Sequence, residues 1–449
     1  MSKQRIQLSD HFTYFRLLRF VLPCIGTTLF TSIYGIVDGL CVSNFVGKTA
    51  FAAVNLIMPL PMLLGTIGFM LGTGGSAIVG ITLGEGDQKK ADRYFTLFLL
   101  AALVSVSVLA VLGIVFLRPI AVLLGAKGEL LDYAVRYGRI LMVSLPTFAL
   151  QNMFQSFFVT AEKPHLGFWF TVGAGCTNIV LDVLMVGVWG WGVEGAAIAT
   201  FISQLVGGVL PVFYFIDRSN SSRLHLCKTS FYSKVLRDAC INGSSELMTN
   251  LSMSLVNILY NYQLLRLAGE NGVAAYGVIM YAAFLFVAVF VGYAVGSAPI
   301  VSFHYGARNH AEVHNLYRKS LRLIAVVAVT LTLASMFIIP CVARIFVGYD
   351  AELLALTSRA FRLYALSFLI MGFNVYASSF FTALGDGVTS ALISFLRTLA
   401  FQVIAILLLP LLLGIDGIWL AVTAAELAAL AVSAAMLLTK DKVFHYRKV

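Results

Sequence analysis

The chain has 449 residues, of which 59% are hydrophobic and only 12% are charged, and its mean hydropathy is +0.90. Soluble domains contain roughly 45–50% apolar and about 25% charged residues, so this composition excludes a soluble enzyme, a disordered chain and a nucleic-acid-binding protein. An integral membrane protein is indicated, and the net charge of +10 is explained below by where the lysines and arginines fall.

A helix needs about 20 apolar residues to cross the hydrocarbon core of a bilayer. Twelve such stretches follow one another along the chain, and several of them are long enough to predict tilted or kinked helices. They are residues 13–43, 51–83, 93–117, 129–160, 164–189, 193–216, 242–268, 273–305, 312–341, 351–384, 388–412 and 416–439. The predicted fold is therefore all α, with twelve transmembrane helices.

Lysines and arginines are divided unevenly between the two sets of alternating connections. One set, which includes both chain ends and the connection 217–241, holds 21 of them, whereas the other set holds 4. Cytoplasmic segments carry the excess of positive charge, so both termini are predicted to be cytoplasmic, with the protein in a plasma (inner) membrane. The first stretch is too long for a cleaved signal peptide and carries Asp38 near its far end.

The two halves of the chain resemble each other at a shift of 223 residues. Arg136 and Arg139, for example, correspond to Arg359 and Arg362. Each half then carries six predicted helices, and because six is even, both halves enter the membrane in the same sense. A pseudo-twofold axis along the membrane normal is expected, as in transporters built from parallel repeats.

This duplication predicts three regions. Residues 1–216 form an N-terminal lobe of six helices, residues 217–241 form a cytoplasmic connection, and residues 242–449 form a C-terminal lobe of six helices with a short basic tail. Two similar bundles that face each other leave a central cleft, and rocking of the bundles gives alternating access.

Two aspartates lie deep inside predicted spans, where ionisable groups are costly and are candidates for function. Asp38 and Asp182 are each roughly 10 Å below the outer surface at about 1.5 Å per residue. Tyr34 is one turn from Asp38, Asn178 is one turn from Asp182, and Thr200 lies at the same depth. We predict a cation-coupling site at which Asp38 and Asp182 take up H⁺ or Na⁺. The alternative for each aspartate is a structural hydrogen-bonding role.

The C-terminal half lacks these acids, since Asn261 and Ala405 occupy the equivalent positions. It carries instead Arg397 and Glu426, which reach similar depth on two helices of opposite direction and are predicted to pair. A buried paired charge is most often structural, and a coupling role is the alternative.

Asn152 and Gln155 share one face of the fourth predicted helix at mid-depth. They are candidates for substrate binding, with helix–helix hydrogen bonding as the alternative. The six cysteines and seven histidines show no metal-binding or catalytic pattern, and no phosphate-binding loop or HExxH motif is present. The sequence therefore predicts neither an enzyme nor a cofactor, and only the two aspartates suggest a metal ion.

Several short motifs, in their order and spacing over nearly the whole chain, resemble the multidrug and toxic compound extrusion (MATE) transporters, in the prokaryotic branch similar to the DNA-damage-inducible transporters. They are Pro23…Gly26…Tyr34-Gly35-Ile36-Val37-Asp38, Gly84-Glu85-Gly86-Asp87, Asn178-Ile179-Val180-Leu181-Asp182, Gly192-Val193-Glu194-Gly195-Ala196-Ala197 and Gly306-Ala307-Arg308-Asn309.

This resemblance implies an efflux antiporter with two six-helix lobes. It also implies that the residues matching the family's N-lobe cation site and substrate cleft are Asp38, Tyr34, Asn178, Asp182 and Thr200, and Asn152 and Gln155, respectively. Another branch of the family places an acidic pair on helices 7 and 10. Here Glu246 stands at the cytoplasmic start of helix 7 and helix 10 has no deep acid, which argues against that mechanism.

The function expected from the sequence is secondary active export of amphipathic, often cationic small molecules, driven by inward H⁺ or Na⁺. A monomer in the lipid bilayer is expected, with no nucleic-acid partner. The alternative is a flippase for a lipid-linked sugar on a related duplicated fold. Such a flippase needs cationic groups in the cleft to meet a pyrophosphate, and the deep acids argue against it. A membrane-embedded transferase, a third class, would need a catalytic acid or histidine on a surface loop.

Overall fold

The computed structural model describes residues 6–46, 48–348 and 350–447, and leaves out the side chains of residues 36, 38–45, 48, 51 and 345. Within the described ranges the protein is all α, without a strand. The helices of the first half are α1 (Tyr14–Phe45), α2 (Lys48–Ile57), α3 (Pro59–Gly84), α4 (Gln88–Leu123), α5 (Gly128–Thr160), α6 (Pro164–Asp182), a π-helical turn (Val183–Val188), α7 (Gly192–Gly208) and α8 (Leu210–Ile216).

The second half begins after an irregular connection. Its helices are α9 (Ser233–Asn242), α10 (Ser244–Gly306), α11 (His310–Val347), α12 (Ala351–Ala365), α13 (Phe368–Ala383), α14 (Gly387–Phe395), a π-helical turn (Leu396–Ala400), α15 (Phe401–Leu413), α16 (Ile415–Thr439) and α17 (Asp441–Phe444).

The twelve predicted spans can all be found among these helices. In the part of the chain that is described, nine helices are long and apolar enough to cross a membrane, and α12 with α13 adds a tenth span that bends by 46°. The eleventh span is α5. Gln151, Asn152 and Gln155 reduce its apolar character, and it packs against α3, α4 and α7.

The twelfth span is half of α10. At 63 residues and about 1.5 Å per residue, α10 is roughly three times as long as the hydrocarbon core is thick. Its helical conformation breaks at Gly269, where φ is 60° and ψ is −150°. Since only glycine adopts this backbone readily, α10 consists of two spans that meet at Gly269, close to the predicted connection between residues 268 and 273.

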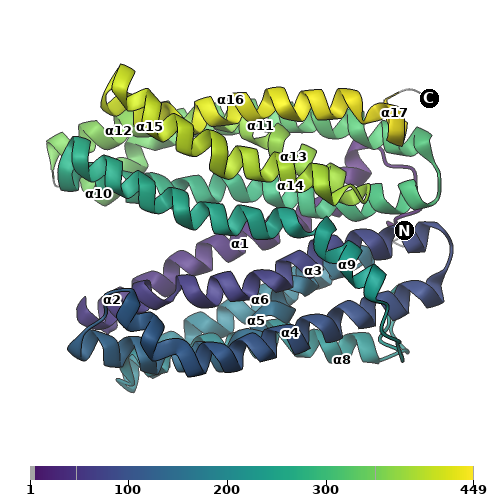
Figure 1. Ribbon diagram of the computed structural model, residues 1–449, viewed down its shortest axis with the longest axis horizontal. Helices are drawn as coiled ribbons and strands as arrows, with labels where there is room; N and C mark the ends of the chain where they lie inside the picture. The colour runs from purple at the N-terminus through teal and green to yellow at the C-terminus, as the bar shows by residue number, and fades with distance from the viewer. Residues whose placement is uncertain (1–5, 47, 349, 448–449) are drawn as a thin grey trace.

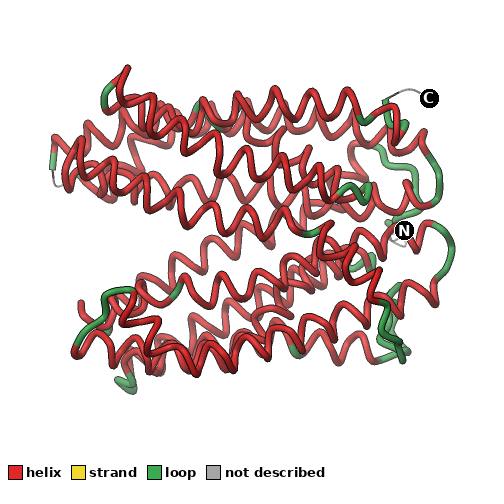
Figure 2. The backbone as a smooth tube through the Cα atoms, in the orientation of Figure 1, coloured by secondary structure: helices red, strands yellow, loops and turns green. Residues whose placement is uncertain are grey.

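The helices form two groups that meet along the middle of the molecule. Figure 1 shows α1–α8 on one side and α10–α16 on the other, and Figure 2 shows how the short connections gather at the two ends. Both chain ends lie at the same end of the molecule (Figure 1). Across the middle, α1 and α3 of the first group pack against α10 of the second.

Glycines allow this close packing between the groups. A Cβ atom at Gly84 would overlap the carbonyl oxygen of Phe303, and one at Gly306 would overlap that of Ile81. Gly84 and Gly306 begin the two equivalent motifs that follow the second helix of each half. Because equivalent positions meet each other, their contact fits the predicted pseudo-twofold relation between the two halves.

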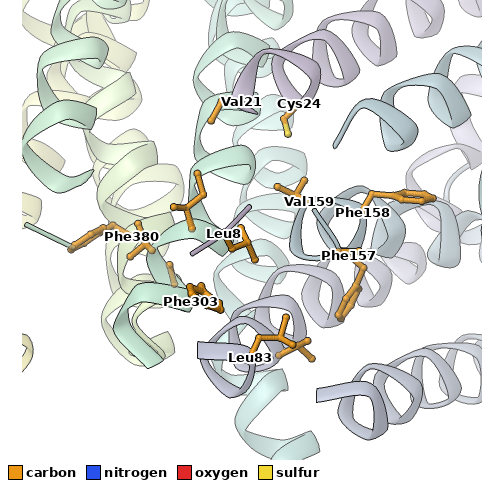
Figure 3. Close-up of a cluster of buried hydrophobic side chains, with 14 of the residues drawn as sticks. Leu8, Val21, Cys24, Leu83, Phe157, Phe158, Val159, Phe303 and Phe380 are labelled. Atoms are coloured by element: carbon orange, nitrogen blue, oxygen red, sulfur yellow. The ribbon is translucent and has the colours of Figure 1, made fainter. Parts of the chain in front are cut away.

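The apolar core is shared at one end of the molecule and divided at the other. A large cluster joins residues of both halves, among them Leu83, Phe157, Phe303 and Phe380, together with Leu8 from the N-terminal segment (Figure 3). Three further clusters of described residues are each confined to one half: those around Ile57 and Leu141 and around Met142 and Leu145 in the first, and the one around Tyr260 and Trp419 in the second. The halves are thus held together at the end that carries the termini.

Candidate functional site

The polar cluster of the first half is centred on the end of α6. Asp182 is the last residue of that helix and has no exposed surface, and Asn178, one turn earlier, is also buried. The π-helical turn Val183–Val188 follows directly. Such turns are frequent at functional sites, because the inserted residue changes the direction of the neighbouring side chains.

The structure brings α1, α6 and α7 together around this position. A Cβ atom at Gly175, one turn before Asn178, would lie 3.2 Å from Cδ1 of the Tyr34 ring, so the ring reaches α6. Thr200, on α7, donates its hydroxyl hydrogen to the carbonyl oxygen of Ala196 at 3.0 Å. Asp38 belongs to α1, and its side chain lies outside the described residues.

The donor set suits a small hard cation or a proton. Asp182 supplies carboxylate oxygens, and Asn178 an amide whose Nδ2 finds no acceptor in the described part of the chain. Hydroxyl, amide and carboxylate oxygens are hard ligands. In the same described ranges, no three His, Cys, Asp or Glu side chains come together as a metal site.

A second candidate site is a cavity of about 700 Å³ between the halves. Most of its wall comes from the second half, from both spans of α10, from α12 to α16 and from the π-helical turn Leu396–Ala400, and α3 and α5 of the first half contribute the rest. Its volume lies within the range of roughly 300–1,000 Å³ that is usual for small-molecule sites.

The cavity wall carries the Arg397–Glu426 ion pair predicted from the sequence. Nη1 of Arg397 lies 3.2 Å from Oε1 of Glu426, whose side chain is buried. The structure adds two partners, since Asn374 donates to Oε2 of Glu426 at 2.7 Å and Ser433 donates to Oδ1 of Asn374 at 2.8 Å. Each oxygen of the carboxylate therefore accepts one hydrogen bond, from Arg397 and from Asn374, and Ser433 holds the Asn374 amide in place.

The internal repeat contains a pattern that could have indicated Asn374 as a buried polar residue. At the shift of 223 residues, Asn374 is the counterpart of Gln151, so both halves carry a buried amide at this point of equivalent helices. Glu246 also lines the cavity, at the third position of α10. Its place at a helix start gave no sign that it would face the same cavity as Arg397.

Asn152 and Gln155 lie apart from this cavity. Asn152 is buried, and its Nδ2 has no acceptor within the described residues. Gln155 lines a much smaller pocket between α1, α5 and α6, beside Thr27 and Thr28. Of this end of α5, Ser156 is the residue that reaches the wall of the large cavity.

A duplicated bundle of apolar helices, with buried charges and a cavity between its halves, is the architecture of a membrane transporter. The model of the MatE family matches the chain twice, over residues 23–184 and again over residues 247–408. The chain therefore belongs to the MatE family, and the second match, 224 residues after the first, confirms the internal duplication.

Known proteins agree with this assignment. The chain is 21% identical to the multidrug export protein MepA of Staphylococcus saprophyticus over 433 residues, which covers 95% of this chain and 94% of the relative. It is also 21% identical to MepA of Staphylococcus aureus strain MSSA476 over 429 residues, again covering 95% and 94%.

Solved structures show the same fold. A MATE protein in complex with MaL6 matches with a TM-score of 0.92 at 22% identity, covering 99% of this chain and 100% of the other. An outward-facing multidrug resistance MATE family transporter of the MOP superfamily gives 0.92 at 22% identity, covering 99% of both chains. A MOP superfamily transporter from Pyrococcus furiosus gives 0.90 at 22% identity, covering all of both chains.

Proposed function

We propose that the protein is a secondary active multidrug efflux antiporter, which exports amphipathic, often cationic compounds in exchange for inward H⁺ or Na⁺. The observation that carries this proposal is the separation of two polar sites within one duplicated fold: the buried carboxylate of Asp182 in one half, and a cavity of about 700 Å³ walled mainly by the other. The cycle needs no cofactor, and a monomer contains both sites.

Alternating access is supported by the unequal packing of the two ends. The shared core that contains Leu83 and Phe303 joins the halves at the end with the termini, whereas each half has its own core at the opposite end. Breaking the shared core and closing the opposite end requires rigid-body rotation of the halves, without repacking the separate cores.

The two lobes that move in this cycle are residues 1–216 and 242–449, and residues 217–241 connect them. We propose that the protein lies in a plasma (inner) membrane, with this connection and both termini on the cytoplasmic side. The argument is the Lys and Arg imbalance. An impermeant thiol reagent added to intact cells should leave single cysteines within 217–241 unlabelled, and efficient labelling there would reverse the orientation.

In the proposed coupling step, Asp182 and Asp38 bind the ion together with Asn178, Tyr34 and Thr200. A bound H⁺ or Na⁺ removes one of the two negative charges and changes the contacts of α6 with α1 and α7, which biases the equilibrium between the two facing states. The membrane potential contributes about 2.3 kcal/mol per elementary charge per 100 mV, so one inward cation can drive export of a neutral or singly charged solute.

A second part of the proposal concerns the polar side chains of α5. Asn152 and Gln155 lie on α5 next to Ser156, which lines the cavity, and we propose that they contact the solute during the change of access. The flippase alternative needs unpaired cations that face the cavity. The described wall has Arg397 alone as a cation, and Glu426 neutralises it.

Proteoliposomes test the proposal directly. Purified protein is reconstituted, H⁺ and Na⁺ gradients are imposed separately, and export of a fluorescent organic cation such as ethidium is followed. Export against a concentration gradient under one inward gradient, together with solute-stimulated flux of that ion, is expected. If the dye equilibrates across the membrane at the same rate under an H⁺ gradient, under a Na⁺ gradient and without a gradient, antiport is contradicted.

A further inference from the structure

Glu246 is a third charged side chain in the wall of the large cavity, beside Arg397 and Glu426. It stands in the first turn of α10 and is half-buried. In the described part of the chain its carboxylate forms no hydrogen bond or ion pair, while its backbone carbonyl accepts a hydrogen bond from Asn250 at 2.9 Å. Glu246 thus lines the cavity without a hydrogen bond or ion pair in these ranges, and Arg397 is close enough to act on its charge.

The other two charges of the wall are already engaged with each other. Oε1 of Glu426 accepts from Arg397 and Oε2 accepts from Asn374, so Glu426 cannot turn toward a ligand without losing one of these bonds. A buried pair that loses one partner leaves an uncompensated charge and is strongly destabilised. This pair therefore behaves as a fixed part of the wall.

The described wall contains two carboxylates and one guanidinium, which is an excess of one negative charge when all three are ionised. The residues contributed by α3 and α5 to the same wall are uncharged. A wall with one surplus negative charge favours a single positive charge brought by a ligand, because opposite charges attract.

The rest of the wall suits an apolar, aromatic body. The rings of Tyr260 and Tyr276 stack with their centroids 4.9 Å apart and an interplanar angle of 10°. Met253, Met280 and Met371 line the same cavity. Methionine side chains adapt to ligands of different shape, and aromatic faces attract cations.

We propose that Glu246 binds the positive group of the exported solute, while the Arg397–Glu426–Asn374 chain holds the wall in place, so that the cavity selects organic monocations with an aromatic body. The proposal rests on the proposed export function only for the direction of transport. As a statement about binding, it applies to the purified protein without any ion gradient.

The experiment compares tetraphenylphosphonium with its neutral relative triphenylphosphine oxide, using equilibrium binding to the purified full-length protein. For Glu246→Gln we expect tetraphenylphosphonium to bind about tenfold or more weakly, which corresponds to about 1.4 kcal/mol. Binding of the neutral compound should be unchanged, and Glu246→Asp should recover part of the affinity for the cation. The control is Glu270→Gln, an exposed acid on the same helix, which should change neither affinity.

Three results would overturn the proposal. The first is wild-type protein that does not bind tetraphenylphosphonium, and the second is a Glu246→Gln protein that binds it as well as the wild type. The third is an equal loss for the charged and the neutral compound, which would assign Glu246 to the shape of the cavity. If export in proteoliposomes fails while Glu246→Gln selectively weakens cation binding, the efflux proposal fails and the assignment of Glu246 stands.

Discussion

Buried charges lie in different places in the two halves of the molecule, although the halves share one fold. In the first half, Asp182 stands at the end of α6, just before a π-helical turn. In the second half the equivalent helix is α14 with α15, its counterpart of Asp182 is the buried apolar residue Ala405, and its π-helical turn carries Arg397 itself. The partner of Arg397 is on the next helix, at Glu426.

This difference indicates which features the repeat preserves. Glycines at equivalent positions, such as Gly84 and Gly306, keep the halves in contact, whereas polar side chains are free to change as long as each buried group finds a partner. A duplicated fold can therefore assign ion coupling to one half and solute binding to the other. The predictions below test that division, beginning with the largest effect.

Asp182→Asn should abolish export against a gradient, down to the level of vesicles without protein. The amide keeps the shape and most hydrogen bonds of the carboxyl group, but it cannot bind a proton or balance the charge of Na⁺. Folding and membrane insertion should be intact, as judged by yield and gel filtration. The matched control is Asp132→Asn, which changes an exposed acid on α5. Normal export by Asp182→Asn would mean that the coupling site lies elsewhere, and Glu426 would then be the next candidate.

Asp38→Asn should have the same effect on export, because the proposed site uses both carboxylates. The same transport measurement decides whether the two aspartates act together. If one of the two variants, Asp38→Asn or Asp182→Asn, exports normally while the other does not export at all, the coupling site contains only one carboxylate.

Glu426→Gln alone should destabilise the protein by about 3–5 kcal/mol, because it leaves Arg397 buried without its counter-ion. The double variant Glu426→Gln with Arg397→Met should lose much less, since it removes both charges. Thermal unfolding and the yield of folded protein measure the difference. If Glu426→Gln and Arg397→Met, made separately, each fold normally and fail to transport, the pair belongs to the transport mechanism, and the contrast between the halves is weaker than we describe.

Gly84→Ala should destabilise this arrangement of the halves by about 1–3 kcal/mol, as overpacked contacts usually do. Its added Cβ atom would overlap the carbonyl oxygen of Phe303. Gly306→Ala should cost about as much if the two positions are related by the pseudo-twofold axis. Gly277→Ala is the control, because a Cβ atom there meets no other atom within 4 Å. Equal melting temperatures for all three variants would contradict the close contact.

The starts of the equivalent helices α6 and α14 also differ. Asp386 caps α14 by accepting from the backbone nitrogen of Thr389 at 3.2 Å, and it pairs with Lys440 at 2.8 Å. Lys163, at the equivalent position before α6, provides no side-chain cap. Partial burial opposes ionisation of Asp386, but the bonds from Lys440 and Thr389 outweigh it and lower the pKa of Asp386 below its usual value.

Asp386→Ala should therefore cost about 1 kcal/mol at pH 7, as the loss of a cap usually does, and Lys163→Ala should cost less. Because the pKa of Asp386 is lowered in the folded protein, its contribution is present above the ordinary carboxyl pKa and is lost as the pH falls through the lowered value. The difference in melting temperature between wild type and Asp386→Ala should shrink in acid. A difference that persists below both pKa values would mean that the carboxylate charge is not its source.

Much of the fold could be predicted from the sequence, because apolar length, charge asymmetry and the repeat are properties of the chain itself. The pairing of Arg397 with Glu426 followed from their depth on neighbouring helices of opposite direction. The position of Glu246 could not be found in this way. Its place in the cavity depends on how α10 approaches Arg397, about 150 residues away along the chain, and no local pattern records such a contact.

The central claim is that the ion acts in one half and the solute binds in the other. It is tested most directly by measuring tetraphenylphosphonium affinity at several pH values and Na⁺ concentrations in wild type and Asp182→Asn. The account predicts that wild-type affinity depends on H⁺ or on Na⁺, and that Asp182→Asn still binds the solute but keeps only the pH dependence that protonation of Glu246 itself imposes. An Asp182→Asn protein whose affinity still varies with the ion as in the wild type would contradict the claim.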